Sequence, residues 1–292
     1  MGFLNALFGG KQLSPEEEKQ EQDAKKFDLL KYDGVKAMRI GQTEYAVRCF
    51  TEALKIKDDL EIHDYLSVVL LRQGELDDAM SELRILAAAE PTNTKILIRL
   101  AQVAHMQEDY ATMMEACTQA TNAEPDNAQA YFLQAQAMLG QQNVVPAIAM
   151  LTKAIALQPD YAEAYLLRGQ TLLKMGDTVS AHADAQWLQE NVGDQEDVLL
   201  LKARVESAQG HTDEALNLYN KVVEVNPFSI DAFRERGQLR LSTGDKEGAS
   251  QDMQTVLELD PQQLADVSGD YSAEGIEQRV RQAYSAANPL GL

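Results

Sequence analysis

The sequence predicts an all-α protein in which pairs of short helices repeat along the chain and stack into an α-solenoid. Three observations predict this class. Proline recurs at a fixed period, glycine and alanine recur in phase with it, and apolar residues follow helical spacing without strand-like alternation. Such a period indicates stacked supersecondary units, and it overrides the two globular domains of ~150 residues that the length alone would suggest.

The proline period is the strongest of these signals. Prolines stand at positions 91, 125, 159, 227 and 261, so they are evenly spaced except for one gap of double length that skips position 193. We expect each of these prolines to follow the second helix of a unit, because proline cannot continue a helix. It also suits the first turn of whatever comes next.

Glycine and alanine mark the turn and the close contact within each unit. Half a period before the proline position, glycine occurs at 41, 74, 176, 210 and 244, whereas Glu108 and Gln142 hold this place in the third and fourth units. Glycine there supplies the positive φ that ends a helix. Shortly after it stands an alanine in six of the seven units, which lets the two helices of a pair approach closely.

These positions resemble the tetratricopeptide repeat family. The sixth unit shows the pattern in Gly210-His-Thr-Asp-Glu-Ala215-Leu-Asn-Leu-Tyr219 and in Val-Glu-Val-Asn-Pro227, and the fifth in Ala162-Glu-Ala-Tyr165-Leu-Leu-Arg-Gly169. The resemblance implies a right-handed superhelix of helix-turn-helix units. We predict seven repeats, at 27–59, 60–93, 94–127, 128–161, 162–195, 196–229 and 230–261.

Both flanks of the repeats carry helix signals. Ser14, Pro15 and the glutamates after them favour a helix start, with Ser14 as N-cap. Since no breaker follows before Gly34, residues 14–26 are predicted to extend the first helix, which runs from about 15 to 40. Residues 262–292 are predicted to form a linker and a capping helix at 273–287 that covers the open end of the array. A partner-binding helix is the alternative there.

Residues 1–13 form an apolar segment and hinge. Phe3, Leu4, Leu7 and Phe8 would share one face of a short helix before Gly9 and Gly10. The segment lacks the features of a secretory signal, and Ala6 stands where a myristoylation site prefers Ser or Thr. It is interpreted either as a tail or a strand of sequence tucked against the array, or as a docking peptide for a membrane surface or a partner.

Composition and motifs argue against several functions. The net charge of −20 disfavours binding to nucleic acid, and no stretch has the ~20 apolar residues of a membrane span. Phosphate-loop and dinucleotide motifs are missing, and the four histidines lie in four separate repeats. Cys49 and Cys117 are expected to be buried free thiols. We therefore predict no catalytic residues, no metal and no cofactor.

The resemblance implies that the first helix of each repeat lines a concave groove. Its second, fifth, sixth and ninth residues would face inward. In repeats four to six the fifth and sixth residues are large and apolar, and they either face the groove or fill the core. The predicted partner-binding set adds two polar residues to these pairs: Phe132, Leu133, Leu166, Leu167, Gln170, Leu200, Leu201 and Arg204.

A second candidate site is anionic. Some members of the family clamp the C-terminal carboxylate of chaperone tails, and this sequence matches that clamp at Lys31, Lys95 and Arg99. It departs from the clamp at Val35 and Tyr65, where asparagines would stand. Lys95 and Arg99 lie one helical turn apart and could share an anion. A looser site for acidic peptides is the broader alternative.

The function predicted from these features is a non-enzymatic, cytoplasmic scaffold or adaptor. It would bind a protein or peptide segment in the concave groove. The alternatives are a membrane-peripheral assembly factor tethered by residues 1–10 and a co-chaperone-like binder of acidic C-terminal tails. An enzyme would require an active site that no motif in the sequence indicates.

Overall fold

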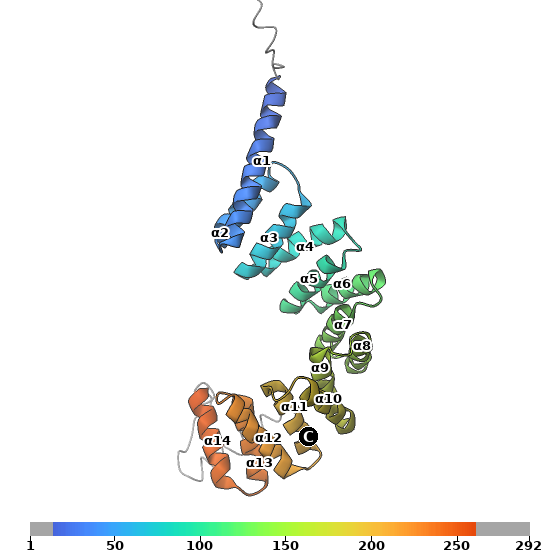
Figure 1. The fold of residues 1–292 in the computed structure, drawn as a ribbon, viewed down its shortest axis with the longest axis vertical. Helices are drawn as coiled ribbons and strands as arrows, with labels where there is room; N and C mark the ends of the chain where they lie inside the picture. Colours follow the sequence, from blue (N-terminus) through green and yellow to red (C-terminus); the bar gives the residue numbers. More distant parts are fainter. Residues whose placement is uncertain (1–13, 261–292) are drawn as a thin grey trace, which may run out of the picture. The chain divides into compact units, whose positions relative to one another are not determined.

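Fourteen α-helices account for most of residues 14–260, which are the residues described by this computed structural model (Figure 1). The predicted N-terminal segment 1–13 and the predicted cap at 273–287 lie outside the described residues. Contacts divide the chain into two units, which are described separately: unit 1 up to residue 143 and unit 2 from residue 144.

The helices follow one another in pairs joined by short turns. Unit 1 contains α1 (Pro15–Arg39), α2 (Thr43–Leu54), α3 (Leu60–Gln73), α4 (Leu76–Ala89), α5 (Thr94–Met106), α6 (Tyr110–Ala123) and α7 (Ala128–Gly140). Unit 2 contains α8 (Val144–Leu157), α9 (Ala162–Lys174), α10 (Thr178–Asn191), α11 (Glu196–Ala208), α12 (Thr212–Val225), α13 (Ile230–Ser242) and α14 (Lys246–Leu259). The predicted all-α class is confirmed, whereas the exact repeat boundaries stay a prediction.

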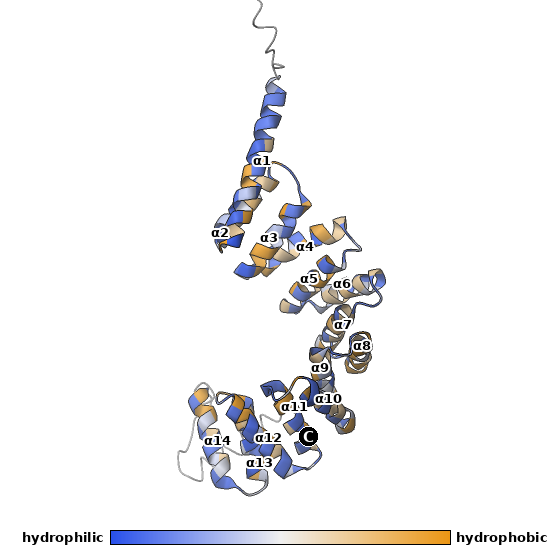
Figure 2. Cartoon of the chain, in the orientation of Figure 1, coloured by the Kyte–Doolittle hydropathy of each residue, from blue (hydrophilic) through white to orange (hydrophobic). Residues whose placement is uncertain are grey.

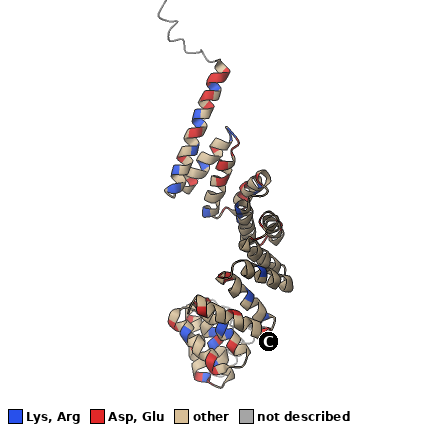
Figure 3. Cartoon of the chain, turned by 45° about the vertical axis from the view of Figure 1, so that its right-hand side comes forward, with Lys and Arg blue, Asp and Glu red and all other residues tan. Residues whose placement is uncertain are grey.

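Helix α1 is much longer than its partner α2, with 25 residues against 12. Ser14 caps it reciprocally, since its hydroxyl accepts from the Glu17 amide at 3.3 Å and its own amide donates to the Glu17 carboxylate at 2.7 Å. The N-terminal half of α1 is hydrophilic all round (Figure 2), with acidic and basic residues alternating along it (Figure 3). Without an apolar stripe, this half is supported by its cap and by the Lys25–Glu21 ion pair at 2.6 Å.

Each helix pair turns through a residue with positive φ. Five of these turns use the predicted glycine, for example Gly74 at φ 79°. In unit 1 the same turn is made by Glu108 at φ 56° and Gln142 at φ 63°. The turn geometry therefore persists where the glycine does not, at a cost in backbone strain of about 1–2 kcal/mol per residue.

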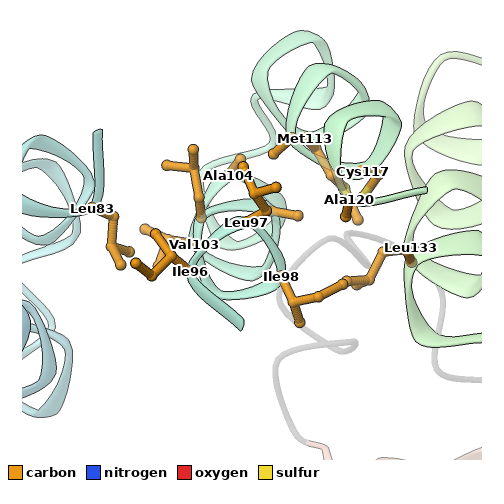
Figure 4. Close-up of a cluster of buried hydrophobic side chains, with 14 of the residues drawn as sticks. Leu83, Ile96, Leu97, Ile98, Val103, Ala104, Met113, Cys117, Ala120 and Leu133 are labelled. Carbon is orange, nitrogen blue, oxygen red and sulfur yellow. The ribbon is translucent and has the colours of Figure 1, made fainter. Parts of the chain in front are cut away.

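The core of unit 1 is almost entirely apolar. Its largest cluster joins α4, α5, α6 and α7, with Leu97 and Met113 fully buried between neighbouring helices (Figure 4). Cys117 lies in the same cluster, and burial raises the pKa of its thiol to about 12. Both cysteines are buried and free, which confirms the sequence-based expectation.

The core of unit 2 combines apolar contacts with an aromatic stack. Trp187 of α10 stacks on Tyr165 of α9, with 3.8 Å between ring centroids and 8° between ring planes. Helix α11 approaches α9 closely at Gly169, where an added Cβ would lie only 2.8 Å from Leu201 Cδ2. A side chain at position 169 would thus force the Leu201 side chain to shift.

Two arginine–aspartate pairs are also part of the unit 2 core. Arg168 of α9 binds Asp184 of α10 through two hydrogen bonds of 2.6 and 2.9 Å. Arg236 of α13 binds Asp252 of α14 in the same way, at 2.6 and 3.1 Å. Asp184 and Asp252 are both buried, so each pair fixes the two helices of one repeat against each other.

Candidate peptide-binding surfaces

First helices of successive pairs touch one another within each unit. In unit 1, α1 contacts α3 and α5 contacts α7, and in unit 2, α9 contacts α11. Their shared face is the one on which the resemblance places the groove. It is called the inner face below, and it carries the predicted site residues.

Lys31 does not offer a free charge on the inner face of unit 1. Its ammonium group lies 2.6 Å from Glu61 and 3.3 Å from Asp59. Burial alone would lower the pKa of Lys31, but the hydrogen bonds with Glu61 and Asp59 and their charges raise it above its ordinary value. Lys31 therefore joins α1 to the start of α3.

The other two cations of the predicted anion site differ from each other. Arg99 donates to Asp64 at 2.7 Å and to the Ser67 hydroxyl at 3.0 Å, so α5 is tied to α3. Lys95 is exposed, and no ion pair is recorded for it within residues 14–260. The anion site stays a prediction, but two of its three cations are already neutralised by carboxylates of this chain.

The apolar pair of α7 divides between surface and core. Phe132 is half-buried, whereas Leu133 is buried in the unit 1 cluster that also contains Ile98 (Figure 4). The expectation that one member of the pair remains partly open thus fits α7. Leu133 itself offers no surface to a partner.

Helix α9 keeps the largest part of the predicted apolar surface open. Leu166, Leu167 and Gln170 are all half-buried, and they occupy little more than one turn. Leu166 also packs against the core cluster of α9, α10 and α11. Leu167 and Gln170 therefore remain the most available predicted contacts in unit 2.

In helix α11 both members of the apolar pair fill the core, which is the alternative that the sequence left open. Leu200 is 6% exposed and Leu201 is fully buried. Leu201 packs toward Gly169 of α9, and Leu200 joins the cluster that α11 forms with α12 and α13. Helices on both sides cover α11, so both leucines belong to the core.

Arg204 likewise serves the fold. Its guanidinium binds both oxygens of Glu235 at 2.7–3.0 Å and lies 3.3 Å from Asp231, while the Tyr219 hydroxyl donates to Glu235 at 3.0 Å. Burial would lower the pKa of Arg204, but Glu235 more than offsets this effect and raises it. The same surroundings, with burial as the main cause, raise the pKa of the Tyr219 phenol. These contacts tie α11 to α12 and α13.

These ion pairs have a sequence signal that the groove prediction did not use. In each pair the residue numbers of the two partners differ by close to one repeat length. The pairs are Lys31 with Glu61, Asp64 with Arg99, and Arg204 with Glu235. Opposite charges at this spacing fall on neighbouring first helices, where they can pair.

Histidines form two small polar clusters with carboxylates. His63 of α3 contacts Glu82 through Nδ1 and Asp58 through Nε2, the latter at 2.7 Å. In unit 2 the buried carboxylate of Glu206 lies 2.7 Å from His211 and 3.3 Å from His182. Within residues 14–260, no group of three or more His, Cys, Asp or Glu side chains is arranged to hold a metal ion.

Away from the inner face, unit 1 has a cavity of about 490 Å³ between α4, α5 and α6. Alanines and Pro91 supply its apolar wall, and Arg84 and Glu115 are among its polar lining. The sequence did not predict this cavity. Among the described helices, none is both long and apolar enough to cross a membrane.

The consecutive helix pairs and their shared inner faces define a helical-repeat protein. The sequence profile of the tetratricopeptide repeat matches residues 150–183 and again residues 200–263. The chain is a tetratricopeptide repeat protein. Proteins of this family generally mediate protein–protein interactions and are usually non-catalytic scaffolds.

Solved structures support the same fold. A tetratricopeptide repeat protein from Parabacteroides merdae ATCC 43184 is 15% identical, covering 88% of this chain and 98% of its own, with a TM-score of 0.67. PilF of Pseudomonas aeruginosa is 20% identical over 72% of this chain and 96% of its own, with a TM-score of 0.57. YrrB, described as a tetratricopeptide repeat protein with an unusual peptide-binding site, is 16% identical over 68% and 97%, with a TM-score of 0.53. No curated protein sequence matches the chain.

Proposed function

We propose that the chain is a non-enzymatic scaffold that binds a segment of a partner protein on the inner face of its first helices. The observation that carries this proposal is the partly open surface of α9, where Leu167 and Gln170 lie within one turn. Apolar side chains beside the Gln170 amide, for which residues 14–260 supply no hydrogen-bond partner, suit a peptide with both apolar groups and backbone polar groups. The peptide-binding site described for YrrB lends the proposal further support.

The test replaces Leu167 with glutamate in the full chain. We expect the Leu167→Glu variant to lose its partner in affinity capture from the native cell, with at least a tenfold weaker interaction when the partner is then titrated directly. A matched control is Val179→Glu, because Val179 is 77% exposed and lies in the first turn of α10. Equal recovery by both variants, each with unchanged helicity, would contradict binding at α9.

A membrane-peripheral assembly factor is the second candidate. The apolar spacing of Phe3, Leu4, Leu7 and Phe8 favours it, because such a face can enter a lipid surface. Flotation with liposomes of the full chain and of a chain lacking residues 1–10 tests the tether. Equal flotation of both chains would remove this candidate.

The proposed location is the cytoplasm, where free thiols such as those of Cys49 and Cys117 persist. Binding of acidic C-terminal tails has less support, because carboxylates of this chain already neutralise Lys31 and Arg99. Subcellular fractionation tests the location. Titration with a peptide that ends in acidic residues tests the tail hypothesis.

A further inference from the structure

Helix α1 is about twice as long as any other described helix, and its first half extends beyond α2 (Figure 1). In residues 15–26 every side chain is exposed except that of Asp23, which is half-buried. A helical segment that is polar all round is stable alone only with many ion pairs between its turns. Among the described residues, α1 contains a single internal pair, Lys25–Glu21. The first half of α1 therefore has a surface that residues 14–260 leave uncovered.

The charges of α1 are divided along its length. Residues 15–24 carry five acidic groups and one basic group, whereas residues 25–39 carry five basic groups and two acidic ones. Lys36 and Arg39 near its end are exposed, and the described part of the chain supplies no ion pair for either. Two copies of such a helix attract each other when they run antiparallel, because each acidic half then lies beside a basic half. A parallel pair would place like charges together.

An apolar patch lies between the two charged halves. Leu29 is 59% exposed and Tyr32 is 67% exposed, and neither belongs to the core cluster that α1 forms with α2 and α3. Residues three or four apart share one face of a helix, so these two lie on the same face as Lys25 and Lys36. The buried residues of α1, such as Phe27, lie on the opposite face. The exposed face thus combines apolar groups with charges of both signs.

One antiparallel register matches both the charges and the apolar patch. In this register, residues whose numbers add up to 57 lie opposite each other. The outer pairs each join an acidic residue of one copy to a basic residue of the other: Glu18 with Arg39 and Glu21 with Lys36. Further in, the Lys25 ammonium lies opposite the Tyr32 ring, an arrangement that favours a cation–π contact. Leu29 lies close to the two-fold axis, where the same patch of both copies meets.

The charge of the remaining chain disfavours self-association elsewhere. Residues 1–60 carry ten basic and eleven acidic groups, whereas residues 61–292 carry 16 basic and 35 acidic groups. Two copies repel each other wherever strongly acidic surface meets itself. The nearly neutral region around α1 is therefore the part of the chain that a second copy approaches against the least repulsion.

We propose that α1 is an antiparallel dimerisation helix, and that a second copy of this chain covers its exposed face through Leu29, Tyr32 and the charged pairs. The proposal goes beyond the scaffold function, because it requires no peptide on the inner face. The contact is small, since a helix of 25 residues is only about 35–40 Å long. Interfaces of limited area are weak and transient, so the dimer forms at micromolar rather than nanomolar concentration.

The first test is sedimentation velocity of the full chain from 1 to 300 µM in 150 mM NaCl. We expect a monomer–dimer equilibrium with a Kd of roughly 10–100 µM. The double variant Leu29→Ser, Tyr32→Ser should weaken it by about tenfold or more, because the two apolar anchors of the contact are lost. The matched control is Val179→Ser with Val225→Ser, since these valines are also more than half exposed but lie in unit 2. It should leave the Kd within about twofold.

Charge reversal tests the pairing of the two halves. The variant Lys36→Glu, Arg39→Glu and the variant Glu18→Lys, Gln22→Lys should each lose the homodimer, because each then has two halves of like charge. An equimolar mixture of the two variants should restore a dimer, since every half meets one of opposite charge. Circular dichroism of each variant checks that α1 keeps its helicity.

Disulfide cross-linking tests the orientation. Oxidation of a mixture of Glu18→Cys and Arg39→Cys chains should link the two different chains, whereas a parallel pair would link Glu18→Cys to itself. The native Cys49 and Cys117 are buried and do not compete. A chain that stays monomeric at 300 µM, a dimer that survives Leu29→Ser, Tyr32→Ser, a mixture without rescue or a parallel cross-link overturns the inference.

The N-terminal segment of the same chain is the competing occupant of this face. A full chain that stays monomeric but dimerises once residues 1–13 are removed would identify that segment as the cover of α1. Such a result overturns the proposal for the intact chain. Dimerisation of the full chain that is unchanged by this deletion supports it, because Ser14 and its cap remain in the shortened chain.

Discussion

Unit 1 and unit 2 are built from the same helix pairs but are stabilised differently. All three buried carboxylates of the described chain, Asp184, Glu206 and Asp252, lie in unit 2. The main clusters of unit 1 are aliphatic and aromatic, and its ion pairs between first helices, Lys31–Glu61 and Arg99–Asp64, are partly exposed. The two units also differ at their turns. Non-glycine residues with positive φ, Glu108 and Gln142, occur among the described residues only in unit 1. One repeat pattern thus accommodates two ways of holding helices together.

The largest effect should come from breaking a buried ion pair of unit 2. Asp252→Ala leaves Arg236 buried without a counter-charge and also removes the partner of Arg240 at 3.0 Å. Breaking a buried pair on one side costs about 3–5 kcal/mol. We expect urea unfolding followed by circular dichroism to show this loss, with faster amide exchange in α13 and α14.

Glu258→Ala is the control for this prediction, because Glu258 is exposed on the same helix. It should change stability by less than about 0.5 kcal/mol. A cost for Asp252→Ala below ~1 kcal/mol would mean that unit 2 does not rely on the pair, and the contrast between the units would fail.

Unit 1 should instead be most sensitive to cavities. Leu97 is fully buried on α5, and Leu97→Ala is expected to cost about 2–5 kcal/mol through lost contacts and the remaining void. The same urea titration measures it. Ile85→Ala on α4 is the comparison, because Ile85 is 41% exposed and should cost under about 1 kcal/mol. Equal costs at the two positions would argue against a close-packed core in unit 1.

His63 gives unit 1 a pH dependence of defined sign. Burial alone would lower its pKa, but hydrogen bonds with Glu82 and Asp58 and the charges of both carboxylates raise it above 6.5. The histidine therefore stabilises unit 1 fully below about pH 6.5, and this contribution is lost as the pH rises through the raised pKa. Melting temperature should fall over this range, by about 2–4 °C for each kcal/mol lost.

The control for this effect is His63→Gln, which keeps a polar side chain but cannot titrate. Its melting temperature should change less with pH than that of the parent chain. Equal protection factors for the unit 1 amides of the parent chain at pH 6 and pH 8, after correction for the intrinsic pH dependence of exchange, would show that His63 does not contribute as proposed.

The smallest effect should be a gain in stability at the strained turns of unit 1. Glu108→Gly and Gln142→Gly remove a Cβ from positions with φ of 56° and 63°. We expect each to raise the free energy of unfolding by about 1 kcal/mol, because glycine adopts this conformation readily. Gly74→Ala, at φ 79°, should lower it by a similar amount. A loss of stability in both glycine variants would mean that side-chain contacts outweigh the strain.

The fold could be predicted from sequence because its signals are local and repeated. Proline, glycine and alanine recur in register, so each helix pair and each turn is indicated several times. Even the turn at Glu108 follows from its place in the period. Much of the candidate surface could not be predicted in this way, because repeat position gives the direction of a side chain but not what covers it.

Helices α9 and α11 illustrate this limit. Both carry two leucines at the same repeat positions, yet Leu167 is half-buried while Leu201 is fully buried. Leu201 is covered by a neighbouring helix, since Gly169 of α9 lets it approach closely. Likewise, Arg204 looked free because its partner Glu235 lies almost one repeat further along the chain. In such arrays, the adjacent repeats determine whether a side chain is buried and whether a charged group is paired.

The stack of Trp187 on Tyr165 gives the molecule a built-in optical label. Trp187 is the single tryptophan of the sequence, and its ring stacks on Tyr165 of α9, two positions along the chain from Leu167. Fluorescence excited at long ultraviolet wavelength therefore comes from this one repeat, because unit 1 has no tryptophan to emit. Emission from Trp187 can follow events at α9 in the unmodified chain, without an added dye.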